Sequence, residues 1–305
     1  VGRLIQSRQL TTESLVVEVA SNDGYLLQYY KQAGVPSLGV EPAANIAQVA
    51  EEHGIHTLCE FFDEALAQQI KDRTGQADVI HANNVLAHVA DLNGVVAGLG
   101  ALLKPTGVAV IEVPYVKELI DRVEFDTIYH EHLCYFSLSA LDYLFRRHGL
   151  LITEVEQIPI HGGSLRLFAT PLQGAGKQLP QGESFKQLLA LETALGMQTV
   201  DFYRDFGARV EALRLHLVTL LKDLKAQGKQ IAVYGASAKG STLLNYCGIG
   251  KELLDFVVDR STVKQGHHTP GTHLPIYAPE KLLEAMPDYV LLLTWNFADE
   301  IMEQQ

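Results

Sequence analysis

The stretch that decides the fold is Val16-Val17-Glu18-Val19-Ala20-Ser21-Asn22-Asp23-Gly24. It predicts a strand that runs into a turn of small residues, where a ligand can approach the backbone closely. Glu41 comes 17 residues after Gly24, in Gly39-Val40-Glu41-Pro42, at the end of the next expected strand. A carboxylate at that place can accept hydrogen bonds from both hydroxyls of a ribose and repels a 2′-phosphate.

Around this stretch, the first 150 residues alternate apolar runs with amphipathic segments. The expected strands are Leu15–Ala20, Ser37–Val40, Asp78–Ala82 and Gly107–Val113, and the expected helices are Tyr25–Ala33, Ala43–His53, Glu64–Arg73, Leu92–Leu103 and Leu138–His148. Strands alternating with helices predict an α/β fold with a parallel sheet. Leu151–Ile158 and Ser164–Thr170, joined by His161-Gly162-Gly163, predict an antiparallel pair at the sheet edge.

The middle of the chain changes character. Gln173–Gly182 is rich in Gly, Gln and Pro and is expected to be a linker, whereas Glu183–Gln227 contains no Pro and has helical spacing. One buried helical stripe is expected there, made of Phe206, Val210, Leu213, Leu217, Leu220 and Leu224. We therefore expect three parts: a ligand-binding domain over residues 1–172, a linker and long helix over 173–228, and a C-terminal domain over 229–305.

The C-terminal part begins a second α/β unit of Rossmann-like character. The strand Ile231–Tyr234 leads into the turn Gly235–Gly240, where backbone N–H groups and the side chains of Ser237 and Lys239 would attract phosphate. Asp259 ends the next expected strand, 24 residues after Gly235, which is the spacing of a ribose contact. Taken alone, this unit suggests a dehydrogenase.

Composition limits the partners and the location. The 305 residues carry a net charge of −12, which disfavours a nucleic-acid partner. Cys59, Cys134 and Cys247 are far apart, so neither a disulfide scaffold nor a metal site is expected within these residues. No apolar run is long enough to span a membrane and no signal segment opens the chain, so a cytoplasmic location without a membrane partner is expected. The chain opens at Val1 rather than Met, and we expect it to be a fragment.

The charge of the first turn distinguishes between nucleoside ligands. A dinucleotide fingerprint reads GxGxxG, but here Gly24 is the only glycine and Glu18 lies in the strand. A carboxylate near the turn would repel a pyrophosphate and would suit the positively charged methionine end of S-adenosylmethionine. This predicts S-adenosylmethionine rather than NAD; the alternative is an ordinary α/β turn with surface acids.

The segment richest in reactive polar side chains is Ile128-Tyr129-His130-Glu131-His132, which follows the expected strand Gly107–Val113. An imidazole suits proton abstraction near neutral pH, Glu131 can fix a tautomer, and Tyr129 can donate to a developing oxyanion. Two alternatives are a metal site made by the His-x-His pair and a surface loop with chance histidines.

These motifs together resemble the sugar C-methyltransferases, which are class I S-adenosylmethionine-dependent enzymes acting on nucleotide-linked deoxysugars. The resemblance rests on residues 18–24 and 39–42, the Tyr-x-Glu-His pattern of Tyr129, Glu131 and His132, the turn 234–240, and Pro270–Ile276. It implies a class I methyltransferase sheet followed by a second, smaller Rossmann-like domain. The cofactor contacts that it implies, together with the turn, are Glu18, Ala20, Ser21, Asn22, Asp23, Gly24, Glu41, Pro42, Phe61, Asn83 and Asn84. For Phe61 and Phe62, core packing is the alternative.

The resemblance also implies the reaction. His132 would remove the proton alpha to a ketone of a nucleoside-diphosphate 4-keto-deoxysugar, expected to be a dTDP-sugar, with Tyr129, Glu131 and His88 assisting. The nucleotide contacts would be Tyr234, Gly235, Ser237, Lys239, Gly240 and Asp259. Members of this family usually carry an N-terminal cysteine-ligated zinc module; it is not among these 305 residues, which agrees with the expectation that the sequence is a fragment. A monomer or homodimer is expected; an NAD-dependent oxidoreductase, a nucleotide-binding module with a degenerate site, and O- or N-methyl transfer are the alternatives.

Overall fold

The computed structural model describes residues 1–174 and 180–305, so part of the expected linker 173–182 lies outside the described residues. The chain forms two compact units. Unit 1 comprises residues 1–116, 133–159 and 163–199, and unit 2 comprises 117–132, 160–162 and 200–305. Residues 117–132, which the sequence analysis placed in the first domain, therefore pack with the C-terminal part of the chain.

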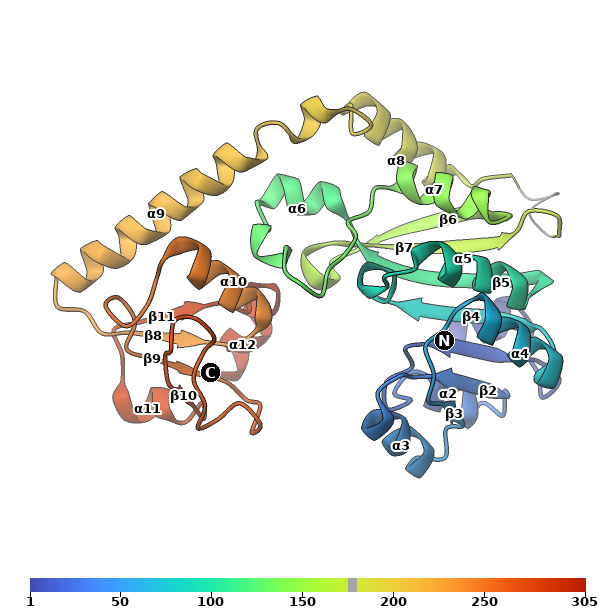
Figure 1. Ribbon diagram of the computed structural model, residues 1–305, viewed down its shortest axis with the longest axis horizontal. Helices are drawn as coiled ribbons and strands as arrows, with labels where there is room; N and C mark the ends of the chain where they lie inside the picture. Colours follow the sequence, from blue (N-terminus) through green and yellow to red (C-terminus); the bar gives the residue numbers. More distant parts are fainter. Residues whose placement is uncertain (175–179) are drawn as a thin grey trace. The chain divides into compact units, whose positions relative to one another are not determined.

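Unit 1 is built on a seven-stranded sheet with the strand order β3-β2-β1-β4-β5-β7-β6 (Figure 1). Its strands are β1 Val16–Val19, β2 Ser37–Val40, β3 Thr57–Leu58, β4 Ala77–Asn83, β5 Leu103–Pro114, β6 Leu150–Ile158 and β7 Ser164–Pro171. The first five strands run parallel, and β7 is antiparallel to both β5 and β6. The α/β fold and the antiparallel edge pair expected from the sequence are confirmed.

Helices cover both faces of this sheet. They are α1 Gly2–Ser7, α2 Leu27–Gln32, α3 Ala44–Glu52, α4 Glu64–Thr74, α5 Leu92–Leu102, α7 Leu138–Arg147 and α8 Glu183–Ala194, with the short 3-10 turn η1 Leu86–His88. The 3-10 turn η3 Ile160–Gly162 lies between β6 and β7 but belongs to unit 2. One core packs residues of α1, α2 and α3 against β1, β4 and β5. The helix α5 packs against both α4 and α7, and α7 also contacts α8.

A buried carboxylate attaches α8 to unit 1. Glu192 is fully buried and accepts the backbone N–H groups of Leu138 and Ser139, at 2.6 and 2.8 Å, and the hydroxyl of Tyr115 at 3.0 Å. Because the first N–H groups of a helix have no partner inside it, this carboxylate satisfies the N-terminus of α7. The helix α8 then ends at Ala194, and Gly196, with a positive φ of 70°, follows its C-cap and interrupts the helical segment expected over 183–227.

Unit 2 holds a four-stranded parallel sheet of order β10-β9-β8-β11. Its strands are β8 Ile231–Tyr234, β9 Phe256–Val258, β10 Ile276–Tyr277 and β11 Tyr289–Leu292; its helices are α6 Val116–Arg122, α9 Phe206–Ala226, α10 Ala238–Cys247, α11 Lys281–Ala285 and α12 Ala298–Gln304, with 3-10 turns η2 Phe125–Thr127, η5 Val200–Tyr203 and η6 Trp295–Phe297. Alternate residues of β8 enter two different cores, Ile231 and Val233 on one face and Ala232 and Tyr234 on the other.

The apolar stripe of α9 differs from the expected one. Val210 and Leu221 are buried, and Phe206, Leu217 and Leu224 are partly buried against the same core. Leu213 and Leu220 are instead 40% and 55% exposed. A spacing of 4 and 3 fits two neighbouring stripes of a helix equally well, so only the packing partner selects Leu221 over Leu220.

The two neighbouring leucines provide a matched test. We expect Leu221→Ala to lower the free energy of unfolding by about 2–5 kcal/mol, because it leaves a cavity in the core of unit 2. Leu220→Ala, at an exposed position of the same helix, should change it by no more than about 0.5 kcal/mol. Denaturant unfolding of both variants measures the difference, and equal effects would contradict the observed face of α9.

Candidate functional site

The turn after β1 adopts the conformation of a close-approach loop. Ala20, Asn22 and Gly24 all have positive φ, at 52°, 54° and 81°. The residues that follow β1 are held by backbone bonds, from Ser21 N–H to the Val40 carbonyl (3.2 Å) and from Gly24 N–H to the Ser21 carbonyl (3.1 Å). Non-glycine residues adopt this conformation only when their surroundings fix it, so the loop is rigidly specified at the carboxyl edge of the sheet.

Glu41 is the main support of this loop. Its carboxylate is nearly buried and accepts the backbone N–H of Asn22 at 3.1 Å and that of Ala43 at 2.9 Å. The remaining lone pairs of the two oxygens can still accept ribose hydroxyls. The neighbouring Pro42 is half-buried, and Asp23 and Gly24 line a pocket of about 540 Å³ together with Lys31 and His53.

Several buried polar atoms beside this loop have no hydrogen-bond partner among the described residues. They are Glu18 Oε2, Ser21 Oγ, Asn83 Oδ1 and Asn84 Oδ1. Glu18 is only 2% exposed, and burial raises the pKa of its carboxyl to about 8. Unsatisfied buried polar groups are costly, and a group of them at one sheet edge is typical of a ligand site.

The two asparagines lie where the sequence analysis expected them. Asn83 ends β4 and Asn84 follows it with a positive φ of 56°. The two phenylalanines separate into different roles, since Phe62 is buried in the core and Phe61 is 80% exposed. Core packing therefore accounts for Phe62, whereas the ring of Phe61 is open to a ligand.

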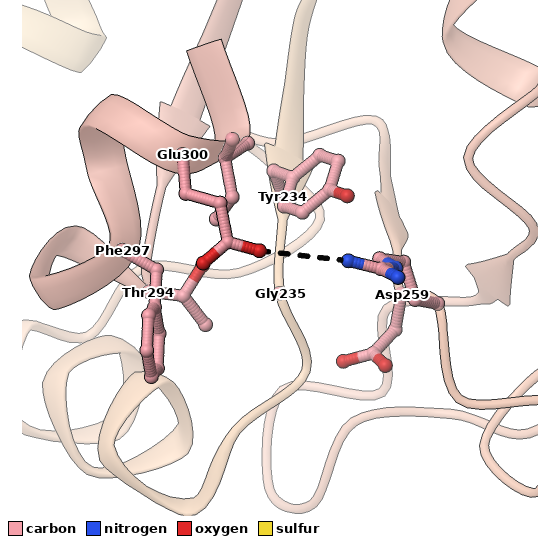
Figure 2. Close-up of a pocket in the computed structure, with 8 residues that line it drawn as sticks. Tyr234, Gly235, Asp259, Thr294, Phe297 and Glu300 are labelled. Atoms are coloured by element: carbon pink, nitrogen blue, oxygen red, sulfur yellow. Dashed lines mark ion pairs between the residues drawn. The ribbon is translucent and has the colours of Figure 1, made fainter. Parts of the chain in front are cut away.

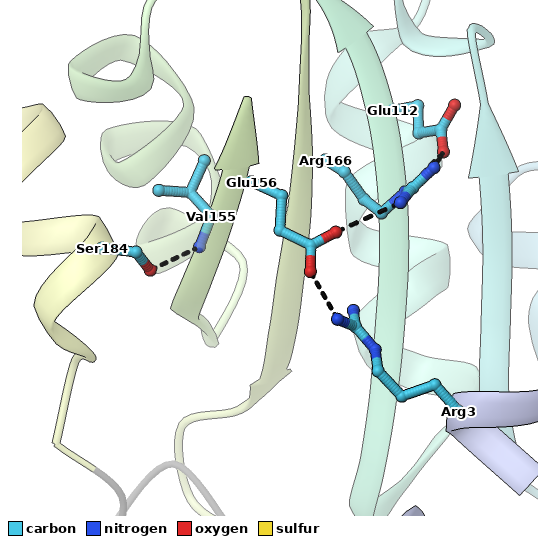
Figure 3. Close-up of polar contacts among 6 residues, drawn as sticks. All are labelled: Arg3, Glu112, Val155, Glu156, Arg166 and Ser184. Carbon is cyan, nitrogen blue, oxygen red and sulfur yellow. Dashed lines mark hydrogen bonds and ion pairs between the residues drawn. The ribbon is translucent and has the colours of Figure 1, made fainter. Parts of the chain in front are cut away.

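A polar cluster that the sequence analysis missed lies on one face of the same sheet. Arg166 on β7 pairs with Glu112 on β5 at 2.6 Å and with Glu156 on β6 at 3.1 Å, and Arg3 pairs with Glu156 at 2.6 Å (Figure 3). A pocket of about 250 Å³ is lined by Glu112, Arg166, Asn83 and His81, among others. Burial lowers the pKa of His81 to about 3, so it is a neutral donor or acceptor there. A polar residue inside an otherwise apolar strand was the available signal.

The Tyr129–His132 segment is a tight turn rather than a strand. The His132 N–H donates to the Tyr129 carbonyl at 3.0 Å, so the His-x-His pair does not present one strand face to a metal. His132 Nδ1 lies 2.8 Å from the Thr127 carbonyl, and His132 Nε2 lies 3.5 Å from the Tyr129 hydroxyl. His130 is exposed, with Nε2 3.8 Å from Glu131. Among the described residues, no group of three or more His, Cys, Asp and Glu could hold a metal ion.

The structure divides the expected catalytic residues between the two units. Tyr129, Glu131 and His132 belong to unit 2, whereas the exposed His88 belongs to unit 1. Within unit 1, the N–H of Leu133 donates to the carbonyl of Ala87 at 2.7 Å. The residue after His132 is therefore bonded to the residue before His88.

The second glycine turn borders a pocket of about 260 Å³ at the carboxyl ends of β8, β9 and β11 (Figure 2). Its lining residues are Tyr234, Gly235, Asp259, Arg260, Thr294, Phe297, Glu300 and Ile301. The strands β9 and β10 lie on one side of β8, and β11 lies on the other side. Ligands of open α/β sheets bind at the point where successive strands change sides in this way. Arg260 and Glu300, which both line this pocket, form an ion pair at 3.9 Å.

Two of the other expected nucleotide contacts already form hydrogen bonds within the protein. Asp259 accepts the backbone N–H groups of Ala236 and Ser261, at 2.7 and 2.8 Å. Ser237 caps α10 by accepting the Gly240 N–H at 3.0 Å. A Cβ on Gly240 would lie 2.9 Å from Leu293 Cβ, so this glycine lets α10 pack close to the end of β11.

Lys239 points at a different set of residues. Its Nζ donates to Asn296 Oδ1 at 2.6 Å and lies 4.7 Å from the centre of the Trp295 ring. Burial lowers the pKa of Lys239, and the carboxyls of Asp126 and Glu124 oppose that change. None of these four partners lines the pocket beside Gly235.

Comparison with known proteins matches each half of the chain to a methyltransferase family. Residues 159–305 match the family described as the C-methyltransferase C-terminal domain, and residues 4–155 match a methyltransferase domain. The C-methyltransferase NovU of Streptomyces niveus is 40% identical over 97% of this chain and 70% of its own length. The chain belongs to the C-methyltransferase family. It is a class I methyltransferase that uses S-adenosylmethionine, and the oxidoreductase alternative is set aside.

More distant likenesses cover only part of the chain. The ubiquinone biosynthesis O-methyltransferase of Bordetella avium (strain 197N) is 30% identical over 30% of this chain and 39% of its own length. Magnesium protoporphyrin IX methyltransferase from Synechocystis PCC 6803 with bound SAH is 14% identical, with a TM-score of 0.44, over 56% of this chain and 78% of that one. No described helix is both long and apolar enough to cross a bilayer.

The residues around the first turn fit S-adenosylmethionine. The unpartnered oxygens of Glu18, Asn83 and Asn84 are hydrogen-bond acceptors, and the methionine end of the cofactor carries an ammonium group and a sulfonium charge. An ionised Glu18 would be stabilised by these charges, which the protein alone does not supply. The chemistry of the site therefore agrees with the cofactor that the family uses.

Glu18 gives this site a measurable pH dependence. Its carboxyl ionises near 4.5 in the unfolded chain but near 8 in the folded one, so unfolding releases a proton in this window. We expect the stability of the ligand-free protein to fall as pH rises from 4.5 to 8, and Glu18→Gln to remove that contribution. The melting temperature of Glu18→Gln relative to that of the parent protein should therefore be higher at pH 8 than at pH 5.

The exposed Glu13→Gln serves as the matched control, and it should keep the pH dependence of the parent protein. If Glu18→Gln and Glu13→Gln follow the parent protein equally, then the carboxyl of Glu18 is not held protonated by burial.

Proposed function

We propose that this C-methyltransferase methylates the carbon alpha to the ketone of a nucleoside-diphosphate 4-keto-deoxysugar, with His132 as the base. The observation that carries the proposal is the orientation of this imidazole. The Thr127 carbonyl can only accept a hydrogen bond, so His132 Nδ1 must be the donor across their 2.8 Å contact. The neutral ring then presents Nε2 as the acceptor, which is the atom that a base requires.

The neighbouring side chains suit the charges that develop. Tyr129 has its hydroxyl 3.5 Å from His132 Nε2, which lets it donate to the enolate oxygen that forms as the alpha proton moves to Nε2. Glu131 supplies a negative charge one residue from the imidazole and can stabilise its protonated form. His88, an exposed imidazole of unit 1, would be an assisting polar group.

The methyl donor adds the remaining chemistry. S-adenosylmethionine, when bound, supplies a methyl group on a sulfonium sulfur, which the nucleophilic carbon takes up with release of S-adenosylhomocysteine. Glu41 would accept the ribose hydroxyls, Glu18 with Asn83 and Asn84 would face the methionine end, and Phe61 would lie against the adenine ring.

The pocket beside Gly235 supports a nucleotide-linked substrate. It has the position of a nucleotide site in an open parallel sheet, an aromatic ring at Phe297, and a cation at Arg260. Its volume of about 260 Å³ is close to the lower end for ligand pockets. A base and ribose with one or two phosphates at the Gly235 turn would use these groups. A small-molecule substrate follows from the family; the dTDP-sugar is the proposal.

The two-site arrangement predicts a crossed pattern of binding. Glu41→Ala should weaken S-adenosylhomocysteine by about 1–3 kcal/mol, the worth of hydrogen bonds to a charged group, and leave thymidine diphosphate unchanged. Ile301→Trp places a larger ring in the pocket beside Gly235, and it should weaken thymidine diphosphate by at least about tenfold and leave S-adenosylhomocysteine unchanged. Calorimetric titration of each variant with each ligand gives the four values.

Glu41 also supports the loop, so Glu41→Gln is the control that keeps one acceptor oxygen for a backbone N–H. It should bind S-adenosylhomocysteine between the parent protein and Glu41→Ala. Loss of both ligands together in a folded variant would contradict two separate sites.

The base is tested by isotope exchange. We expect His132→Asn to lower turnover by about 10²–10⁴-fold, the usual worth of a general base, while both ligands still bind. Exchange of the alpha proton of a dTDP-4-keto-deoxysugar with deuterated solvent, followed by NMR without methyl donor, should be lost in the same variant. The full-length protein is used, and His130→Asn is the matched control.

Exchange at the parental rate in His132→Asn would show that another group removes the proton. If His130→Asn lost exchange instead, the base would be the neighbouring imidazole.

A further inference from the structure

The segment that carries Tyr129 and His132 is built into unit 2 by an apolar anchor. Phe125 is 6% exposed and belongs to the core of α9, α10 and β8. Its ring lies 5.0 Å from that of Tyr246 on α10. Arg209 on α9 adds a hydrogen bond of 2.6 Å to the Asp121 carbonyl. The position of the segment is therefore set by the C-terminal core.

A buried polar contact lies next to this anchor. The Trp295 indole N–H donates to Asp126 Oδ2 at 2.8 Å, and Asp126 is 2% exposed. Lys239 lies over the Trp295 ring and donates to Asn296. Burial raises the pKa of Asp126, while the Trp295 bond, Lys239 and the backbone N–H groups of Asp126 and Thr127 oppose that rise. A carboxylate with these partners is satisfied, and losing one donor is costly.

Only one residue, Thr127, links this contact to the His132 imidazole. Asp126 and Thr127 are consecutive residues of η2, and the Thr127 carbonyl accepts from His132 Nδ1. The η2 turn is closed by Thr127 N–H to the Glu124 carbonyl at 3.1 Å and Ile128 N–H to the Phe125 carbonyl at 3.0 Å. Fixing the Asp126 side chain therefore fixes the carbonyl that selects the tautomer of His132.

The residues on the other side of the contact belong to the nucleotide pocket. The chain from 294 to 297 contributes Thr294 and Phe297 to the pocket lining, and Trp295 and Asn296 to the contacts with Asp126 and Lys239. Four consecutive residues thus serve the pocket and the polar contact, and three of them form the short turn η6.

We infer that Trp295 and Asp126 are positioning residues for His132, joined to the nucleotide pocket through the turn 294–297, and that Lys239 supports this pair. The inference rests on the proposed function of His132. It assigns to Lys239 a role inside the protein in place of the phosphate contact expected from the sequence. Trp295 and Asp126 touch no reacting atom in this role.

The test uses the full-length protein with a dTDP-4-keto-deoxysugar and S-adenosylmethionine. Trp295→Phe keeps a ring and removes the N–H donor. We expect kcat to fall by about 10–100-fold, as for other groups that orient a catalytic side chain, with the KM for the sugar nucleotide within about twofold of the parent. Thymidine diphosphate should bind as in the parent protein.

Two substitutions at Asp126 separate positioning from mere folding. Asp126→Asn keeps an oxygen that accepts from Trp295, whereas Asp126→Leu does not, so Asn should retain most of the parental kcat and Leu should lose it as Trp295→Phe does. Nitrogen-15 NMR of the His132 ring, assigned with His132→Asn, should show protonated Nδ1 in the parent and in Asp126→Asn. The population of this tautomer should fall in Asp126→Leu and Trp295→Phe.

If Asp126→Leu or Trp295→Phe kept both the kcat and the His132 tautomer population of the parent protein, the inference would be overturned. If Trp295→Phe does not fold, the comparison of Asp126→Asn with Asp126→Leu decides, and equal kcat and tautomer in those two would also overturn it. An active His132→Asn would instead refute the proposed base. An inactive His132→Asn beside fully active Trp295 and Asp126 variants would refute only the positioning role.

Discussion

Both units depend on a hydrogen bond from the backbone of a turn to the carboxylate that follows the next strand. In unit 1, Glu41 after β2 accepts the Asn22 N–H, and in unit 2, Asp259 after β9 accepts the Ala236 N–H. Each turn is also bonded to the end of that second strand, by Ser21 to Val40 and by Gly235 to Val258. A buried carboxylate needs such donors, and the turn needs a fixed acceptor, so each stabilises the other.

This arrangement explains why the two turns are rigid and still able to bind. A carboxylate that accepts one N–H per oxygen keeps lone pairs for a ligand, and its charge is partly compensated before the ligand arrives. Around Glu18 the compensation is missing, and the protein keeps that carboxyl protonated near neutral pH. The first turn is thus a preformed loop beside a carboxyl that burial keeps protonated near neutral pH.

The interleaving of the chain is the second constraint. Residues 117–132 leave unit 1, pack their Phe125 into the C-terminal core, and return at Leu133 to a bond with Ala87. The Tyr-x-Glu-His motif is therefore carried by the unit that contains the pocket beside Gly235. Because the orientation of His132 depends on Thr127, the C-terminal core takes part in setting the tautomer of a residue that the sequence places beside the methyltransferase sheet.

The sequence by itself determined the α/β class, the two glycine turns, the acids that follow the second strand of each sheet, and the methyltransferase family. These follow from local patterns of strand, turn and charge, which are read within a few residues. Only the tertiary structure decided that Leu221 rather than Leu220 is buried, that α8 ends before Gly196, that Gly240 serves packing against Leu293, and that Lys239 faces Trp295. Each of these depends on a partner far away in the chain, and local spacing does not name that partner.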